Sequence, residues 1–234
     1  MTHAELNDAG ICVNAAVHAR LARFVAALLD ENRSINLTAT RDPDDAWALH
    51  VCDSLALLHP LARQPSGRLF DLGAGGGSPG IPLAIAREDV HVTLFDATRK
   101  KIAAQRRIAE RLGLNNVTTL WGRAESSAHE AALREAFDVV VARAVARLPV
   151  VMEYAAGFVR PGGTCWFFES CRALEETIAG AERAARRCAL RLAETRSYTL
   201  PGGHGRRALV GYRKMRPLPK HLPRPPGVPK KTPL

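Results

Sequence analysis

The sequence predicts an α/β fold organised around a mostly parallel sheet. From Gly67 onward, short apolar runs alternate with longer amphipathic ones, which is typical of strand-helix-strand units. A glycine-rich loop follows the first of these runs, and 47% of the 234 residues are apolar, enough for one substantial core. No stretch of eighteen apolar residues occurs and the amino terminus is acidic, so we expect a soluble protein that is not exported.

A helical extension is expected before the sheet, over residues 1–65. Its first helix should span 13–29, where apolar residues recur at steps of four, four, three and four: Val13, Val17, Leu21, Phe24 and Leu28. A second helix should open at Asp42-Pro43, with a capping acid and a proline in the first turn, and should end at Pro60 and Pro65.

The sheet domain is expected over residues 66–215. Its strands should lie at 68–72, 91–95, 117–120, 137–141, 164–168 and 207–212. Its helices should lie at 79–87, 98–112, 125–135, 148–158 and 172–189. The segment Pro161-Gly162-Gly163 should form a sharp turn that leads into the fifth strand.

The charge is concentrated at the carboxyl-terminal end. Residues 195–234 hold ten of the 33 Lys and Arg residues and no acid, whereas the rest of the chain is balanced, and the net charge is +10. With seven prolines between Pro217 and Pro233, residues 216–234 are expected to form an extended, partly disordered basic tail. Such a tail suggests a polyanionic partner, and it lacks the apolar face of a membrane-surface helix.

The five cysteines are odd in number and show no Cys-x-x-Cys spacing. They lie in segments that otherwise look like core. We therefore expect reduced packing thiols, a cytoplasmic protein and no metal site.

The glycine-rich loop runs from Leu69 to Gly80 and is compatible with three kinds of ligand. A dinucleotide fingerprint counted from Gly73 puts Ser78 where the third glycine should stand, although counting from Gly75 meets Gly80. The run Gly76-Gly-Ser-Pro-Gly80 matches a hydrolase nucleophile elbow, but Pro79 lacks the backbone N–H that the oxyanion hole needs.

The third ligand is S-adenosylmethionine, whose enzymes use a Gly-x-Gly-x-Gly loop preceded by an acid. Asp71 supplies the acid, and Gly73, Gly75 and Gly77 supply the loop. Asp96 lies at the tip of the second strand, where a carboxylate would accept hydrogen bonds from ribose hydroxyls. A dinucleotide enzyme would use an acid at this position in the same way. Alternatively, Asp96 only caps the next helix.

Two further positions follow the third and fourth strands. Glu125, in Gly122-Arg-Ala-Glu125, would meet the adenine rim or act as a first-turn acid. Arg143 lies at the carboxyl edge of the sheet, where ligands of open α/β folds bind, unless it is only a solvated surface side chain.

Together these residues resemble the bacterial 16S rRNA guanine-N7 methyltransferase family, RsmG or GidB, over nearly the whole chain. The segments that carry the resemblance are Asn36 to Asp42, His50 to Leu55, Asp71 to Pro82, Asp96 with Arg99 to Lys101, Arg123 to Glu125, Arg143 to Val145, and the basic end from Pro223 to Leu234. The resemblance implies a Rossmann-like class I fold, with a seven-stranded mostly parallel sheet and an N-terminal helical extension.

The same resemblance implies methyl transfer from S-adenosylmethionine to N7 of a guanine in 16S rRNA or the small ribosomal subunit. We expect a monomer. The cofactor contacts would be Gly73, Ser78, Ala124, Glu125 and Arg143. Basic side chains that would meet RNA phosphates, together with the basic tail, are Arg99, Lys100, Lys101, Arg123, Arg206 and Arg207.

No catalytic acid or base is expected, because N7 of guanine carries a lone pair and no proton. The chain departs from the family where Phe168-Glu-Ser-Cys171 replaces a Leu-Lys-Gly-like segment. Glu169 is therefore a weak catalytic candidate, which would favour positive charge developing on the purine. A nicotinamide oxidoreductase, and an RNA-binding module with a vestigial cofactor site, stay open as alternatives.

Overall fold

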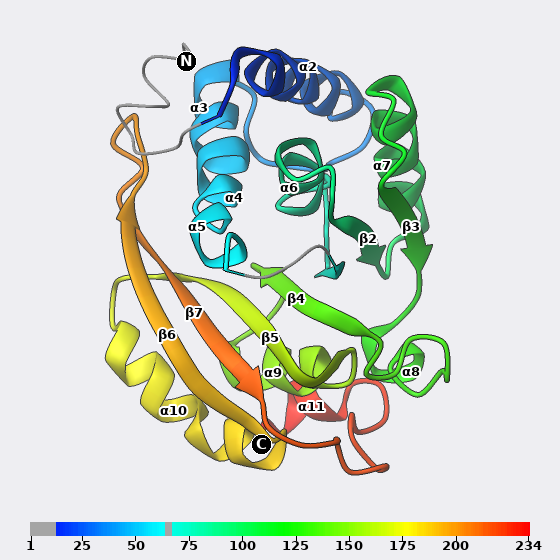
Figure 1. Cartoon of the computed structure of the whole chain (residues 1–234), viewed down its shortest axis with the longest axis vertical. Coiled ribbons are helices and arrows are strands. Elements are labelled where there is room, and N and C mark those ends of the chain that lie inside the picture. The colour runs from blue at the N-terminus through cyan, green and yellow to red at the C-terminus, as the bar shows by residue number, and fades with distance from the viewer. Residues whose placement is uncertain (1–12, 64–66) are drawn as a thin grey trace.

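A computed structural model describes residues 13–63 and 67–234 and contains one seven-stranded sheet (Figure 1). The strands are β1 Arg68–Leu72, β2 His91–Asp96, β3 Val117–Trp121, β4 Phe137–Arg143, β5 Val159–Ser170, β6 Leu190–Thr199 and β7 Arg206–Lys214. Their order is β3-β2-β1-β4-β5-β7-β6. Strand β7 is antiparallel to both of its neighbours and the other pairings are parallel, which confirms the predicted α/β class.

The strand order reverses at β1, which pairs with β2 on one side and with β4 on the other. The connections on the two sides therefore run in opposite directions, and a crevice opens above the carboxyl ends of the central strands. Leu72, Asp96 and Arg143 end β1, β2 and β4 at this edge. The edge is where a ligand of such a fold binds.

Helices cover both faces of the sheet (Figure 1). One face packs against α6 Gly80–Ala86 and α7 Arg99–Arg111, over which α2 Ala15–Glu31 lies, and the other packs against α9 Leu148–Ala156 and α10 Leu174–Arg187. Each face has its own apolar core, and Phe70 packs against Phe95, Phe137 and Phe158 in the second. Within the described ranges, no helix has the length and apolar character needed to cross a bilayer.

The second helix of the N-terminal extension is broken, whereas the sequence predicted one continuous helix. It comprises α3 Pro43–Ala46, a π-helical turn η1 Trp47–Cys52, α4 Asp53–Leu55 and α5 Leu58–Leu61. Asp42 caps it as predicted, since its carboxylate accepts from the amides of Asp44 (2.8 Å) and Asp45 (3.1 Å). Pro60 lies inside α5 and does not end it, because the first turn of a helix needs no amide donor.

Three elements of the sheet domain differ from prediction. Strand β5 begins at Val159, so Pro161-Gly162-Gly163 lie within it, at an irregularity of its pairing with β4, and not in a turn before it. Strand β6 was not predicted: it is an edge strand whose side chains are mostly exposed and include Arg191, Glu194 and Arg196, so it lacks an apolar run. Helix α8 covers only Ala124–Ser127, and turns follow it where a helix was expected to 135.

The expectation of an extended, partly disordered tail over residues 216–234 is wrong. Leu218, Leu222 and Leu234 are buried in the core beside α9, and Val228–Lys231 form the short helix α11. The prolines interrupt regular structure, but the leucines between them bury enough apolar surface to hold the segment on the domain.

Candidate functional site at the carboxyl edge of the sheet

Two adjoining cavities lie at the carboxyl edge of the sheet. The larger, of about 420 Å³, lies over the ends of β1 to β4, and the smaller, of about 320 Å³, lies between β4, β5 and the N-terminal extension. Ala144, which follows β4 with a positive φ of 55°, lines both. Both volumes fall in the range of roughly 300–1,000 Å³ typical of small-molecule sites.

The glycine loop gives the larger cavity its floor. Gly73 has a φ of +76°, and a Cβ there would lie 2.6 Å from Cγ2 of Val145, so only glycine fits. Gly75 and Gly77 also have positive φ, and they shape the loop without lining either cavity. Of the three predicted glycines, Gly73 alone therefore faces the candidate ligand space.

Asp96 lines the larger cavity with a carboxylate that the backbone holds in place. Oδ2 accepts from the Gly75 amide (3.1 Å), and Oδ1 accepts from the Thr98 amide (2.8 Å). A carboxylate has about four acceptor sites, so two contacts leave capacity for the hydroxyls of a bound sugar. Asp96 thus combines the capping role and the ligand role that the sequence left open.

Ala124 and Glu125 line the opposite side of the larger cavity. Oε1 of Glu125 accepts from the Gly227 amide (3.1 Å) and from the Tyr154 hydroxyl (3.3 Å). Burial and the nearby Glu125 carboxylate raise the pKa of Tyr154 to about 12, so the phenol stays protonated as a donor.

These features fit an adenosyl nucleoside. Gly73 permits close approach to the backbone, Asp96 offers a fixed acceptor for a ribose diol, and Phe95 and Val145 add apolar walls for a purine. In residues 13–63 and 67–234, no group of three or more His, Cys, Asp or Glu side chains is arranged to hold a metal ion.

Asp71 and Ser78 line neither cavity and support the loop from behind. Oδ2 of the fully buried Asp71 accepts from the Gly80 amide at the start of α6 (2.7 Å). Oδ1 of Asp71 and the Ser78 hydroxyl are buried and have no hydrogen-bond partner in the described part of the chain. Since Ser78 does not face a cavity, the arrangement is not a nucleophile elbow.

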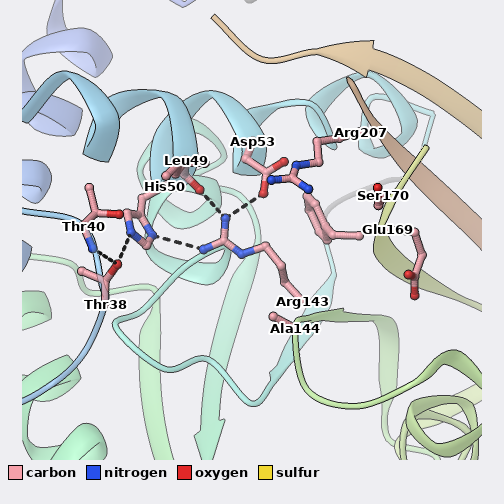
Figure 2. A pocket seen from close by; sticks show the side chains of 11 residues that line it. Thr38, Thr40, Leu49, His50, Asp53, Arg143, Ala144, Glu169, Ser170 and Arg207 are labelled. Atoms are coloured by element: carbon pink, nitrogen blue, oxygen red, sulfur yellow. Dashed lines mark hydrogen bonds and ion pairs between the residues drawn. The ribbon is translucent and has the colours of Figure 1, made fainter. Parts of the chain in front are cut away.

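Arg143 points away from the larger cavity and into the smaller one (Figure 2). Its guanidinium donates to Asp53 Oδ2 (2.8 Å) and to the Leu49 carbonyl, and it lies 3.2 Å from His50 Nδ1. The other oxygen of Asp53 accepts from the Tyr198 hydroxyl (2.5 Å). Arg143 thus ties the end of β4 to the N-terminal extension, instead of facing the nucleoside cavity as the sequence suggested.

His50 extends this network to the loop before α3. Its Nε2 lies 2.9 Å from Thr38 Oγ1, and the side-chain amide of the buried Asn32 donates to the carbonyls of Thr38 (3.0 Å) and Thr40 (3.1 Å). Burial, with help from the Arg143 charge, lowers the pKa of His50 to about 3, so the imidazole is neutral. Two of the segments behind the family resemblance therefore meet at this cavity.

Glu169 lines the smaller cavity together with Ser170 and Arg207. Figure 2 shows it on the side of the cavity away from His50, apart from the Arg143 network. Burial raises the pKa of Glu169. Glu169 therefore belongs to the wall of the smaller cavity and not to the Arg143 network.

The six basic residues predicted to contact RNA gather at the same edge. Lys101 and Arg123 line the larger cavity and Arg207 lines the smaller, whereas the remaining three are exposed: Arg99, Lys100 and Arg206. The Arg99 guanidinium lies 4.1 Å from the ring centroid of Trp121, which is 49% exposed.

Sequence reasoning missed several residues of the site: Trp121, Tyr154, Gly227 and Lys230. The sequence did contain a signal that the segment with Gly227 and Lys230 packs on the domain. Apolar residues recur through this proline-rich segment, and an arm surrounded by water would not need them: Leu218, Leu222 and Leu234. Trp121 directly follows the predicted strand at 117–120, and nothing in the neighbouring sequence indicates that its ring is exposed.

The strand order, the antiparallel β7 and the nucleoside-shaped cavity define a Rossmann-like class I methyltransferase dependent on S-adenosylmethionine. Solved structures of this class are similar. Precorrin-6y C5,15-methyltransferase from Geobacter metallireducens has a TM-score of 0.52 at 14% identity, covering 69% of this chain and 87% of that one. TYW2 of M. jannaschii, solved in complex with AdoMet, has a TM-score of 0.50 at 13% identity, with 70% and 77% covered. At such identities the likeness shows the fold alone.

The chain belongs to the GidB family, rRNA small subunit methyltransferase G, whose model matches residues 17–201. Ribosomal RNA small subunit methyltransferase G of Carboxydothermus hydrogenoformans is 37% identical over 213 residues, 91% of this chain and 89% of that protein. The Deinococcus radiodurans protein of the same name is 40% identical over 215 residues, with 92% and 85% covered. The resemblance found in the sequence is confirmed, and the protein is an S-adenosylmethionine-dependent rRNA methyltransferase.

The buried Asp71 predicts a pH dependence of stability. Burial raises its pKa to about 7, so between roughly pH 4 and pH 7 the native state binds a proton that the unfolded chain has lost. Relative to Asp71→Asn, the wild type should therefore lose stability as the pH rises through this window, by about 1.4 kcal/mol per unit of pKa difference. Urea unfolding of both proteins at pH 5 and pH 8 measures the change.

Asp138→Asn is the control of opposite sign. Burial raises the pKa of Asp138, but hydrogen bonds from the Arg68 amide and the Arg160 side chain lower it overall. The wild type should therefore gain stability relative to Asp138→Asn as the pH rises from below pH 4. Equal pH dependence of wild type and Asp71→Asn would show that Asp71 is ionised in the native protein.

Proposed function

We propose that the protein transfers a methyl group from S-adenosylmethionine to N7 of a guanine in 16S ribosomal RNA. The observation that carries this proposal is the meeting of two cavities at Ala144, one suited to a nucleoside and the other open to an acceptor base. Relatives named ribosomal RNA small subunit methyltransferase G support the substrate class.

The cofactor is placed in the larger cavity. Its contacts would be Gly73, Asp96, Ala124 and Glu125, while residues that line neither cavity hold the loop in shape: Asp71, Gly75, Gly77 and Ser78. When bound, S-adenosylmethionine supplies an electrophilic methyl group on a sulfonium. Arg143 is proposed to position the N-terminal extension and not to contact the nucleoside directly, since its guanidinium is engaged by Asp53, Leu49 and His50.

Two titratable side chains of the smaller cavity, His50 and Asp53, are not free to remove a proton from an acceptor. Both ring nitrogens of His50 have partners and its pKa is about 3, while Asp53 is occupied by Arg143 and Tyr198. None of these groups is available as a general base. Guanine N7 has an in-plane lone pair and carries no proton, so the work of the chain is to align the base and exclude water.

The alternatives fit the site less well. A nicotinamide oxidoreductase would hold a dinucleotide, whereas membership of the GidB family supports S-adenosylmethionine. An RNA-binding module with a vestigial cofactor site would not need Gly73 and Asp96 to be arranged as they are beside an open cavity.

The direct test uses methyl-labelled S-adenosylmethionine with both deproteinised 16S RNA and intact small subunits. One guanine should become labelled and should then be cleaved by the borohydride and aniline treatment that detects 7-methylguanosine. Asp96→Ala is the matched control, in which transfer should be lost together with cofactor binding. Label on a ribose, on an exocyclic amine or on no nucleotide would overturn the assignment.

Glu169 is proposed to stabilise the positive charge that develops on the purine as N7 is methylated. Glu169→Gln keeps the size of the side chain and removes its charge, so the single-turnover rate should fall about 100-fold, at the lower end of the range for lost electrostatic stabilisation. Cofactor affinity should not change, because Glu169 does not line the larger cavity. Glu176→Gln, on the exposed face of α10, is the control, and an unchanged rate in Glu169→Gln would remove the proposed role.

The RNA face is proposed to run along the same edge, through Arg99, Lys100, Lys101, Arg123, Arg206 and Arg207, with Trp121 as a stacking platform. The Trp121 indole N–H donates to the Ala97 carbonyl (3.0 Å), which fixes the ring, and Arg99 lies over it. An exposed aromatic ring among cations is the arrangement on which unpaired RNA bases stack. Deleting residues 216–234 would not test RNA binding alone, because buried leucines would be lost with the charges.

Trp121 and Arg123 should affect RNA binding in different ways. Trp121→Ala should weaken RNA binding about 5- to 100-fold with little change in salt dependence, because stacking is worth about 1–3 kcal/mol per base. Arg123→Ala should reduce the slope of log affinity against log salt by about 1. Trp121→Phe, which keeps a ring, is the control, and wild-type affinity in Trp121→Ala would exclude the platform.

A monomer is proposed because residues of a single chain line both cavities. Three cysteines of the described ranges are free thiols: Cys165, Cys171 and Cys188. Reduced cysteines and a ribosomal substrate support a cytoplasmic location.

A further inference from the structure

The carboxyl-terminal segment, residues 217–234, reaches the larger cavity, where Gly227 and Lys230 are among the lining residues. We propose that this segment is a wall of the cofactor site and that Lys230 covers the bound nucleoside. The inference rests on the placement of the cofactor in the larger cavity. It gives a binding role to a segment whose composition suggests only an RNA-binding arm.

A buried ion pair anchors the segment. Glu153 of α9 is fully buried, and its Oε2 lies 2.6 Å from Arg224 Nη2. The Arg224 backbone amide also donates to Oε1 of Glu153 (2.8 Å). Removing Arg224 would leave the fully buried Glu153 carboxylate without a compensating charge, which is strongly destabilising. The segment is therefore held firmly at a point three residues before Gly227.

Several backbone groups of the proline-rich segment before this anchor are also hydrogen-bonded. The Arg134 guanidinium donates to the carbonyls of Leu218 (3.0 Å), Pro219 (3.1 Å) and Leu222 (3.0 Å). The Leu218 amide donates to Glu135 Oε1 (2.7 Å). One side chain thus satisfies carbonyls that no helix or strand could serve in a sequence this rich in proline.

At the cavity, the segment holds a cofactor-site carboxylate directly. Gly227 adopts a φ of +84°, and its amide donates to Glu125 Oε1, the same oxygen that accepts from Tyr154. Docking of the segment therefore fixes the orientation of Glu125 before any ligand arrives. A preorganised acceptor costs less free energy to bind against than a mobile one.

Lys230 and Lys231 provide a natural comparison. Both are exposed and both belong to α11, but only Lys230 lines the cavity. A lysine can lay its aliphatic stem over an apolar ligand while its ammonium stays in water. The stem of Lys230, not its charge, is thus the part that covers the nucleoside.

The test measures binding of S-adenosylhomocysteine to the full-length protein by calorimetry. Lys230→Ala should weaken binding roughly 3- to 10-fold through loss of apolar contact, whereas Lys230→Met, which keeps a stem, should stay within about 2-fold of wild type. Lys231→Ala should leave affinity unchanged. Asp96→Ala serves as the reference for the site itself.

The outcomes separate this inference from the proposed function. If Asp96→Ala loses affinity while Lys230→Ala matches Lys231→Ala, the wall is excluded and the cofactor placement stands. If Asp96→Ala also binds normally, the placement is wrong and the inference falls with it.

Hydrogen exchange gives a second readout that does not depend on any substitution. Because binding to the docked state stabilises that state, the Gly227 amide and those of α11 should exchange more slowly in the presence of S-adenosylhomocysteine. An unchanged exchange rate at Gly227 under saturating ligand would overturn the proposal.

Discussion

The reversal of strand order at β1 is the constraint on which both cavities depend. Connections on the β2 side and on the β4 side leave the sheet in opposite directions, so no helix covers the edge between them. The glycine loop after β1 fills part of this gap with backbone, since a side chain at Gly73 would collide with Val145. Ala144, a single small residue, then separates the larger cavity, proposed for the nucleoside, from the smaller cavity, proposed for the acceptor base.

The sheet forms only one side of the smaller cavity, the one proposed for the acceptor base. The other side comes from the N-terminal extension, and Arg143 holds the two together through Asp53, Leu49 and His50. The Arg143 side chain is only 17% exposed, and its charge is matched by a carboxylate, a carbonyl and an imidazole held neutral by burial. The π-helical turn at Trp47–Cys52 is part of this arrangement, because it contains Leu49 and His50 and Asp53 follows it directly. The network thus sets the relative position of the two walls between which the base must lie.

Local chemistry and tertiary packing differed in how well the sequence revealed them. The glycine loop and the fixed acid at Asp96 follow from short-range requirements, namely positive φ and the tip of a strand, so residue order alone predicts them. The direction in which Arg143 points depends on Asp53, ninety residues away, and spacing along the chain contains no such information. Strand β6 was not predicted for a related reason. It is stabilised by pairing with β7, whereas its own sequence contains no apolar run.

The basic carboxyl-terminal end shows why the location of charge matters more than its sum. Of the ten cations beyond residue 195, Lys214 is fully buried 3.1 Å from Glu135, and Arg224 is paired with the buried Glu153. Burial lowers the pKa of Lys214, whose ammonium also donates to the Ala156 carbonyl, so it serves the core and not a polyanion. Part of the charge that composition would assign to RNA binding therefore holds the chain end against α9.

Arg206 and Arg207 remain at the start of β7, with Arg207 on the acceptor cavity, where a phosphate beside the target base would pass. In the proposed arrangement, cations placed there would steer the RNA toward the acceptor cavity, whereas Lys214 and Arg224 hold the carboxyl-terminal segment that lines the larger cavity.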